Sequence, residues 1–183
     1  MDKVTDIIFK IKGIITTIAV IFFVGILGYW GYEHFIAEAT ITSKNEYFTV
    51  KVSKRYTFVE DTKISKDDHE MAVYDKDSGV YIFGYAYTKD GSLKTFTEEE
   101  RAEIFENEKF KKVSEVKEEK AGKLTAYTYT YEYIDNNNDN YFMKVVYVEG
   151  KKADYLLLLE SPTATLDSHE KQLNKIMKSF IEN

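Results

Sequence analysis

The 183-residue chain contains no cysteine. No disulfide can therefore brace the fold, no lipidated cysteine can attach the chain to a membrane, and zinc sites built on thiolates are excluded. Arginine is also scarce, since only Arg55 and Arg101 occur beside many lysines. Together with frequent Asn, Ile and Tyr, this composition is typical of a prokaryote with an AT-rich genome. The core must stabilise the protein without covalent cross-links.

Motifs that carry chemistry are missing as well. The chain has no glycine-rich phosphate loop and no residue spacing typical of a hydrolase triad. Its net charge of −6 repels phosphate backbones, which makes nucleic acid an improbable partner. We therefore expect a protein that is not an enzyme, with no catalytic residue, no cofactor, no metal site and no nucleic-acid partner.

Charge is absent from residues 13–32, GIITTIAVIFFVGILGYWGY. A helix of this length spans about 30 Å, the hydrocarbon thickness of a bilayer. Tyr29, Trp30 and Tyr32 close the segment with amphipathic rings that are favoured at the membrane interface. The uniform apolarity argues against a buried core helix, which normally keeps a polar stripe. We expect a single transmembrane helix over residues 13–32, with these three aromatic residues as interface anchors.

The flanking charges predict the orientation of this helix. Lys3, Lys10 and Lys12 precede it, so the positive-inside rule places residues 1–12 in the cytoplasm as a short N-terminus. The rest of the chain then lies outside the cytoplasm at the cell membrane. Ala37-Glu38-Ala39 has the small-x-small pattern of a signal peptidase site. The long apolar run favours an uncleaved signal anchor, but cleavage after Ala39 stays open.

Behind a juxtamembrane linker at 33–45, residues 46–183 are long enough for one exported domain. Residues 97–100 have a capping-box pattern that predicts a helix start, with Ala102, Phe105 and Ile104 on its apolar face. A second helix is indicated from about Thr165, with an apolar stripe that ends at Phe180. β-rich runs and polar turns predict strands at 47–52, 71–74, 80–87, 111–118, 124–134, 141–148 and 155–159.

Several of these strands are apolar on both faces, which is unusual for an antiparallel sheet with one wet side. The run YFMKVVYV at 141–148 carries apolar residues at odd and at even positions, and YLLLL at 155–159 does likewise. Helices before and after the meander supply cover for both faces. The expected fold class is α+β, an α/β/α sandwich with a central antiparallel sheet, preceded by the N-terminal transmembrane helix.

The most distinctive motif is YTYTYEY at 127–133. Because strand side chains alternate, Tyr127, Tyr129, Tyr131 and Tyr133 share one face of their strand. One interpretation buries these rings under a helix, with their hydroxyls at the rim. The other makes them an exposed candidate interaction surface for a glycan, a peptide or a partner protein. The sequence leaves both interpretations open.

Three further stretches resemble functional sites but have simpler explanations. DNNNDN at 135–140 lacks the glycine and glutamate of a helix-loop-helix calcium loop, so a hairpin turn is favoured. DDHE at 67–70 gathers His69 with carboxylates but has no distant fourth ligand. His169 lies near the apolar stripe of the last helix and is interpreted as a partly buried packing residue. Its neighbour Ser168 points to another face of the helix, so the two do not form a nucleophilic pair.

The order of elements resembles the PsbP/DcrB-like superfamily, which includes photosystem-associated PsbP, bacterial envelope lipoproteins and eukaryotic Ran-binding relatives. The matching pieces are YFTVKVSKRYTF at 47–58, the Gly122 break before KLTAYTYTY, and the final strand, loop and helix that end in Ser179-Phe180. The likeness covers roughly residues 46–181. It implies a PsbP-like α/β/α domain that serves as a binding or assembly module, with no shared catalytic residues.

The resulting functional expectation is a membrane-tethered, extracytoplasmic, noncatalytic protein-binding or assembly module with an envelope protein as partner. The alternative is an envelope protein that binds a small molecule or a metal ion. A cavity between helix and sheet would favour the alternative, and an exposed tyrosine face would favour the first. The sequence predicts neither the partner nor the oligomeric state.

Overall fold

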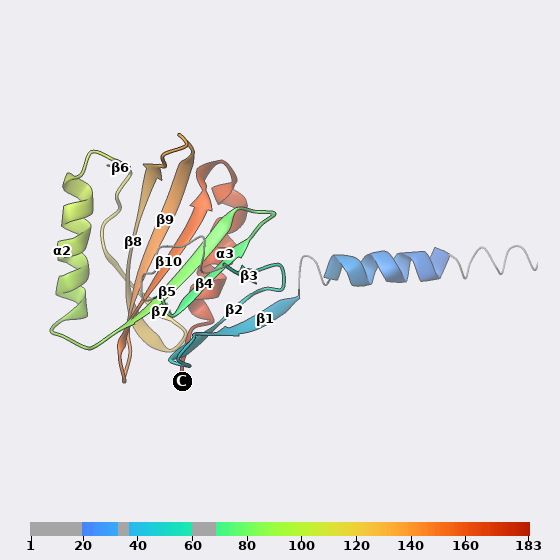
Figure 1. Cartoon of the computed structure of the whole chain (residues 1–183), viewed down its shortest axis with the longest axis horizontal. Coiled ribbons are helices and arrows are strands. Elements are labelled where there is room, and N and C mark those ends of the chain that lie inside the picture. Colours follow the sequence, from blue (N-terminus) through green and yellow to red (C-terminus); the bar gives the residue numbers. More distant parts are fainter. Residues whose placement is uncertain (1–19, 33–36, 60–68) are drawn as a thin grey trace, which may run out of the picture. The chain divides into compact units, whose positions relative to one another are not determined.

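The computed structural model describes residues 20–32, 37–59 and 69–183, except for the side chains of residues 165–168. The chain divides into two units, Met1–Glu38 and Ala39–Asn183, and each is considered by itself (Figure 1). In the first unit, residues 20–31 form a helix whose apolar side chains are exposed, Phe22 by 70%. No helix within the described residues is both long and apolar enough to cross a membrane. Residues 13–19 of the expected anchor lie outside the described residues.

The larger unit is built on an eight-stranded antiparallel sheet in the order β3-β4-β5-β10-β9-β8-β6, with β7 also paired to β8. The predicted hairpin and the three-stranded meander are confirmed as β4–β5 and β8–β9–β10. The strands are β3 (Thr57–Phe58), β4 (Met71–Asp75), β5 (Val80–Tyr87), β6 (Phe110–Lys111), β7 (Lys117–Ala121), β8 (Leu124–Ile134), β9 (Asn140–Glu149) and β10 (Asp154–Pro162).

A second sheet of three strands is one feature that the sequence analysis missed. Its order is β1 (Glu38–Thr42), β2 (Phe48–Ser53) and β11 (Ile181–Glu182). The expectation that residues 33–45 form only a linker is therefore wrong for 38–42, which pair with β2. The expected strand at 111–118 is likewise divided, because β6 ends at Lys111 and Lys112 takes a positive φ of 52°.

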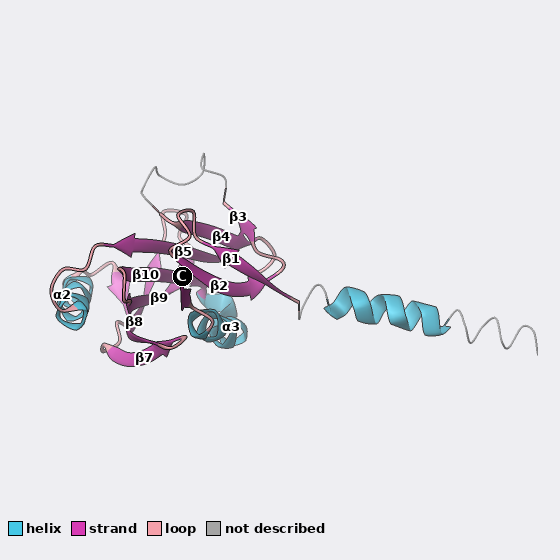
Figure 2. Cartoon of the chain, turned by 90° about the horizontal axis from the view of Figure 1, so that it is seen from below, coloured by secondary structure: helices cyan, strands magenta, loops and turns pink. Residues whose placement is uncertain are grey.

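Two helices cover opposite faces of the large sheet (Figures 1 and 2). α2 (Leu93–Glu106) lies beside β8 and β9, and α3 (Leu166–Lys178) follows the short 3-10 helix η2 (Thr163–Thr165) and contacts β2, β7 and β10. The α+β class and the antiparallel sheet are thus confirmed. The predicted sandwich needs one correction, since the layer that contains α3 also contains the strands of the small sheet.

α2 begins earlier than the capping-box pattern predicts. Its N-cap is Ser92, whose Oγ accepts a hydrogen bond from the Thr95 N–H, and the first helical residue is Leu93. Thr97 is instead a buried residue inside the helix, and its hydroxyl donates to the Leu93 carbonyl at 2.7 Å. The prediction of Thr97 and Glu100 as a capping box is wrong, because Ser92 already satisfies the orphan N–H group.

The main core lies between the large sheet and the layer that contains α3. Apolar residues at helical spacing on α3 meet alternate residues of β5, β9 and β10 there. Leu173, Ile176, Met177 and Phe180 are each at most 2% exposed. Burial of such a side chain stabilises a fold by about 1.5–3 kcal/mol relative to exposure. The predicted apolar stripe is confirmed as the inner face of α3 for Leu173, Ile176 and Met177, and Phe180 is buried just after the helix ends at Lys178.

The Ser179-Phe180 pair joins the end of α3 to the rest of the domain. Ser179 Oγ accepts the Lys51 N–H at 2.7 Å, which ties the helix end to β2. The Phe180 ring stacks on Phe48, with centroids 5.2 Å apart. Gly122 packs against this helix end with a φ of 57°, and a Cβ added there would lie 2.0 Å from the Phe180 carbonyl oxygen. The Gly122 break and the Ser-Phe pair therefore meet in space.

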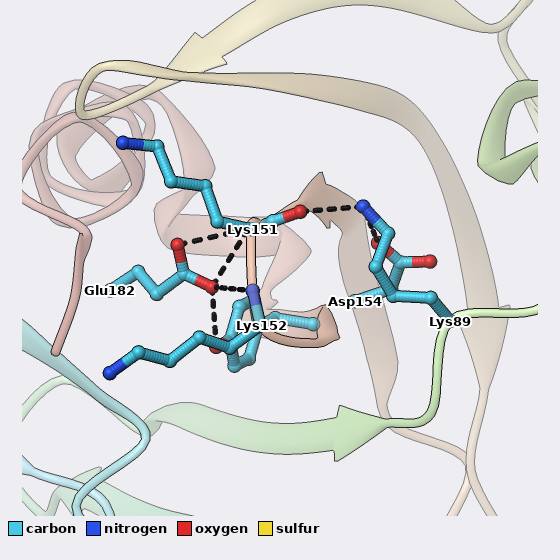
Figure 3. Close-up of polar contacts among 7 residues, drawn as sticks. Lys89, Lys151, Lys152, Asp154 and Glu182 are labelled. Atoms are coloured by element: carbon cyan, nitrogen blue, oxygen red, sulfur yellow. Dashed lines mark hydrogen bonds and ion pairs between the residues drawn. The ribbon is translucent and has the colours of Figure 1, made fainter.

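The β9–β10 turn is held by residues from two distant segments (Figure 3). The Glu182 carboxylate accepts hydrogen bonds from the backbone N–H groups of Lys151 and Lys152 at 2.7–2.9 Å. On the other side, Lys89 Nζ donates to the Gly150 carbonyl at 2.7 Å and lies 3.7 Å from Asp154 Oδ1. The final strand thus fixes a turn of the large sheet.

Candidate functional site: an aromatic sheet face

One face of the large sheet is built from aromatic side chains. Strand side chains alternate between faces, and β4, β5 and β8 place their tyrosines on the side of α2, together with Phe83 of β5 and Tyr141 and Tyr147 of β9. The side of α3 is mainly aliphatic, although Tyr155 and Phe142 also lie there. The aligned registers extend this pattern across the sheet. We call this surface the aromatic face, which consists of Tyr74, Tyr81, Phe83, Tyr85, Tyr87, Tyr127, Tyr129, Tyr131, Tyr133, Tyr141 and Tyr147.

α2 lies mainly over the part of this face that belongs to β8 and β9. Beneath it, Tyr129 and Tyr147 are 1% and 4% exposed. Both hydroxyls donate to the carboxylate of Glu100 on α2, Tyr129 at 3.2 Å. Burial, reinforced by this carboxylate, raises the pKa of both tyrosines well above the ordinary value. This half is a closed, hydrogen-bonded layer.

The inward face of α2 is more polar than expected. The predicted apolar face included Ala102 and Phe105, but both are exposed, and Phe105 is 61% exposed. The side that meets the sheet instead carries Leu93, Thr97, Glu100, Arg101 and Ile104. These positions follow the spacing of one helix face. Polar contacts to tyrosine hydroxyls therefore replace much of the apolar packing that usually attaches a helix to a sheet.

The other half of the aromatic face, on β4, β5 and β10, carries half-buried rings. Tyr74 stacks on Tyr81 with ring centroids 5.6 Å apart, and Tyr81 stacks on Phe83 at 6.2 Å with an interplanar angle of 3°. Tyr85 and Tyr87 form another parallel pair at 6.2 Å. These rings support one another and present partly exposed apolar surface. Such a surface is typical of sites that bind other molecules.

Glu160 places a carboxylate within this aromatic surface. In the strand registers it pairs with Tyr81 on β5 and with Met143 on β9. Its Oε2 accepts the Tyr133 hydroxyl at 2.7 Å. Burial raises the pKa of Glu160, the hydrogen bond from Tyr133 opposes this shift, and the charge of Asp135 adds to it. The aromatic face therefore combines large rings with an acidic group held in a partly dry environment.

The four tyrosines predicted as an interaction surface divide between the two interpretations. Tyr129 is buried under α2, whereas Tyr127, Tyr131 and Tyr133 are half-buried. Burial, with Glu100 and Glu160 nearby, raises the pKa of Tyr131 to about 12. Sequence reasoning missed Glu160, although its position offered a signal. Glu160 follows Leu156 and Leu158 at two-residue spacing, so all three side chains lie on the same face of β10. A carboxylate at a position where an apolar residue is usual is the signal.

The opposite face of the sheet contains a polar cavity of about 230 Å³ beneath α3. Lys144 on β9 lies at this cavity and is only 8% exposed. Its Nζ donates to Glu119 Oε2 and to Asn174 Oδ1, each at 2.9 Å. Burial alone raises the pKa of Glu119, but hydrogen bonds from Lys144 and Thr128 shift that pKa below its ordinary value. The sequence analysis did not identify Lys144.

His169 has a partner that the sequence analysis also missed. Its Nδ1 lies 3.1 Å from the hydroxyl of Ser161, which is 0% exposed. Burial lowers the pKa of His169, and the charge of Asp75 opposes that shift. A serine with no exposed surface cannot meet a substrate, so the pair joins β10 to α3 rather than forming a nucleophilic site. No local sequence pattern connects positions 161 and 169.

The loops considered for metal binding use their polar groups internally. Asp135 Oδ1 accepts the backbone N–H groups of Asn137 and Asp139 at 2.9 and 2.8 Å, as in a hairpin turn organised by its own carboxylate. In the other motif, His69 lies 3.3 Å from Lys44 Nζ, while positions 67 and 68 lie outside the described residues. The residues that the structure describes include no group of three or more His, Asp or Glu side chains suited to a metal ion.

No protein-family model and no curated protein matches this chain. Solved structures do match it. The solution structure of cyanobacterial PsbP (CyanoP) from Synechocystis sp. PCC 6803 has a TM-score of 0.58 at 10% identity, over 80% of this chain and 93% of that one. LpqN of Mycobacterium tuberculosis, involved in cell envelope biogenesis, has a TM-score of 0.52 at 13% identity, over 82% and 93%.

A crystal structure from Bacteroides thetaiotaomicron also matches, with a TM-score of 0.56 at 10% identity over 79% of this chain. This chain spans about half of that structure's length, 48%. The described domain therefore has a PsbP-like fold, and the expected resemblance is confirmed at that level. At these identities the likeness defines the fold alone, so the function must be argued from the site.

Proposed function

We propose that this protein is a membrane-tethered, extracytoplasmic and noncatalytic binding module of the PsbP/DcrB-like superfamily that docks a protein partner on its aromatic face. The observation that carries the proposal is Glu160, a carboxylate among half-buried rings that α2 leaves uncovered. Aromatic side chains give large, rigid contact area and are enriched in the cores of protein interfaces. A carboxylate at the centre of such a surface fits a basic side chain.

The chemistry of Glu160 restricts the partner to a segment that presents a lysine or an arginine. Tyr133 occupies Oε2, and no described residue donates a hydrogen bond to Oε1. A guanidinium or ammonium group on Oε1 would form a charge-assisted hydrogen bond and would compensate the cost of burying the carboxylate. The faces of Tyr81 and Tyr131 would add cation–π attraction. The domain's negative charge favours the same partner.

The N-terminal segment supports the proposed tether. The described part of the uncharged run is helical, and its apolar side chains are exposed. A helix that is apolar on every side is stable where lipid surrounds it. The lysines that precede the run favour a cytoplasmic N-terminus and an extracytoplasmic domain at the cell membrane. Tyr29, Trp30 and Tyr32 would then lie at the outer interface.

The course of β1 favours retention of this segment. Ala39 lies within β1, so cleavage after Ala39 would remove the first two residues of a strand that pairs with β2. Retained β1 contributes Ile41 to the main core. An uncleaved anchor keeps the strand whole. The involvement of LpqN in cell envelope biogenesis, on a similar fold, supports an envelope role for this chain as well.

The proposal is tested by photocrosslinking of the full-length protein in its native membrane. A photoreactive phenylalanine derivative replaces Tyr81, which lies beside Glu160. The same protein is prepared with Glu160→Gln, which keeps the side-chain shape and removes the charge. Glu132→Gln serves as the control, because Glu132 lies on β8 next to Tyr131 and Tyr133 but points to the opposite face and pairs with Lys112.

The expected result is one crosslinked protein whose attached peptide contains a lysine or an arginine near the crosslink. Its yield should fall at least tenfold with Glu160→Gln and stay unchanged with Glu132→Gln. Equal capture by both variants, or no reproducible capture at position 81, would refute docking on the aromatic face. Mass spectrometry of the same samples reports whether peptides that precede Ala39 persist.

A further inference from the structure

The cavity on the other side of the sheet from the aromatic face has the features of a small-ligand site. It lies between α3 and the β7–β8–β9 part of the sheet, with a volume of about 230 Å³. Pockets for drug-sized ligands measure about 300–1,000 Å³, so this space suits a smaller molecule. Every residue that lines it belongs to the larger unit. Of the aromatic face only Tyr129 lines the cavity, and neither Tyr81 nor Glu160 does.

The deepest charged group at the cavity is Lys144, and its hydrogen-bonding capacity is not exhausted. An ammonium group has three N–H donors. Glu119 and Asn174 accept two of them, and no third acceptor for Lys144 exists among the described residues. The Asn174 amide accepts with its oxygen, which directs its NH₂ group elsewhere. Lys117 on β7 adds a second ammonium group at the rim. These donors suit a carboxylate.

Acidic and apolar groups line the same cavity. Glu119 uses Oε2 for its bonds with Lys144 and Thr128, so its other oxygen makes no hydrogen bond to a described residue. Glu170 on α3 supplies a second carboxylate, and Phe142 and Leu173 supply apolar surface. The cavity thus offers two cations, two anions and an apolar wall. Because these charges balance, it favours neither a simple anion nor a simple cation.

We infer that this cavity binds a free α-amino acid with an apolar side chain. The ligand carboxylate lies against Lys144 and Lys117, the ligand ammonium group against Glu119 and Glu170, and the side chain against Phe142 and Leu173. A zwitterion satisfies both charge sets at once, whereas an ion of one sign leaves one set uncompensated in a partly buried site. The volume accommodates an aliphatic amino acid of the size of leucine.

The test is isothermal titration of the full-length protein in detergent with each apolar L-amino acid, beginning with L-leucine. L-leucinamide, which lacks the carboxylate, and N-acetyl-L-leucine, which lacks the ammonium group, are titrated in parallel. Lys144→Met removes the central cation, and Lys117→Ser removes the rim cation from an exposed position where folding is not at risk. Lys120→Ser is the matched control, since Lys120 lies on β7 with its Nζ bonded to Thr125 away from the cavity.

The expected result is saturable binding of at least one apolar amino acid, weakened at least tenfold by removal of either ligand charge. Lys144→Met should abolish the binding and Lys117→Ser should weaken it about fivefold, with no change for Lys120→Ser. Absence of binding for every apolar amino acid would overturn the inference. Equal affinity for N-acetyl-L-leucine, or affinity unchanged by Lys117→Ser and Lys144→Met, would do the same. None of these outcomes involves Tyr81 or Glu160, so the docking proposal is judged separately.

Discussion

Glu100 attaches α2 to the sheet, and Glu100→Ala should destabilise the domain by about 2–3 kcal/mol. The carboxylate accepts the hydroxyls of Tyr129 and Tyr147, whose side chains are 1% and 4% exposed. A buried hydroxyl left without an acceptor costs about 1–3 kcal/mol. Two such hydroxyls give about 2–6 kcal/mol. The lower part of this range applies because Glu100 itself is only half-buried, so water can replace part of the lost bonding.

A double-mutant cycle separates this hydrogen bonding from the packing of the helix. Tyr147→Phe removes the hydroxyl and keeps the ring, at an expected cost of about 1.5 kcal/mol. In the Glu100→Ala background the same change removes a hydroxyl that already lacks its acceptor, so its cost should vanish. The expected coupling energy is therefore about 1.5 kcal/mol, within the range of about 0.5–3 kcal/mol found for residues in direct contact.

The free energies of unfolding are measured by urea titration of the full-length protein in mild detergent, followed by the near-ultraviolet circular dichroism of the tyrosines. Glu99→Ala is the control, because Glu99 is an exposed neighbour on the same helix and its loss should cost less than about 0.5 kcal/mol. Strict additivity in the cycle would refute the assigned role of Glu100. A loss for Glu100→Ala no larger than that for Glu99→Ala would refute it too.

Three further predictions concern the rest of the domain. Gly122→Ala should cost about 2–4 kcal/mol in the same urea titration, because it combines a φ of 57° with a Cβ 2.0 Å from the Phe180 carbonyl oxygen. Gly91→Ala, with a φ of 70° but no atom within 4 Å, should cost only about 1 kcal/mol, and equal losses would contradict the clash. Burial raises the pKa of Glu182, but hydrogen bonds from the backbone of Lys152 and Lys151 lower it below the ordinary value of 4.5. Glu182 therefore stabilises the folded domain above pH 4.5, and this stabilisation is lost as the pH falls. In Glu182→Gln the free energy of unfolding should change less with pH below 4.5. The pKa of Tyr131 is raised from 10.0 to about 12, so stability should decline as the pH rises from 10 to 12. A Tyr131 tyrosinate absorbance, measured as the difference from Tyr131→Phe, that has its midpoint at pH 10 would contradict this.

Local patterns predicted the elements whose cause is local. Gly79 takes the positive φ that the β4–β5 turn requires, and β-rich runs joined by short polar turns predicted β8, β9 and β10. The apolar stripe of α3 followed from helical spacing alone. The start of α2 was wrong because Thr97 matches a capping pattern equally well, and only the structure shows that Ser92 makes the bond. Local signals of similar strength compete, and the sequence alone does not rank them.

Features that depend on distant contacts could not be predicted in the same way. β11 has only two residues, and it forms because Ile181 and Glu182 pair with β2 across the domain. The cavity at Lys144 requires β7, β9 and α3 to meet, although these elements are separated along the chain. The charged run at 117–120 gave no sign that Glu119 faces inward toward Lys144. Such sites follow from strand register and helix placement, which periodicity does not determine.

The two faces of the large sheet perform different physical tasks. The face opposite the aromatic face packs against α3 and the small sheet and supplies the main core, so most of the hydrophobic stabilisation lies there. The aromatic face is most fully closed where α2 binds it through Glu100, and the rings on β4 and β5 contribute less burial. Because the fold does not rely on this uncovered half, Glu160 can carry a charge whose burial is unfavourable for stability. The raised pKa of Glu160 reflects the unfavourable burial of its charge. Charged groups buried at a cost in stability are typical of functional surfaces.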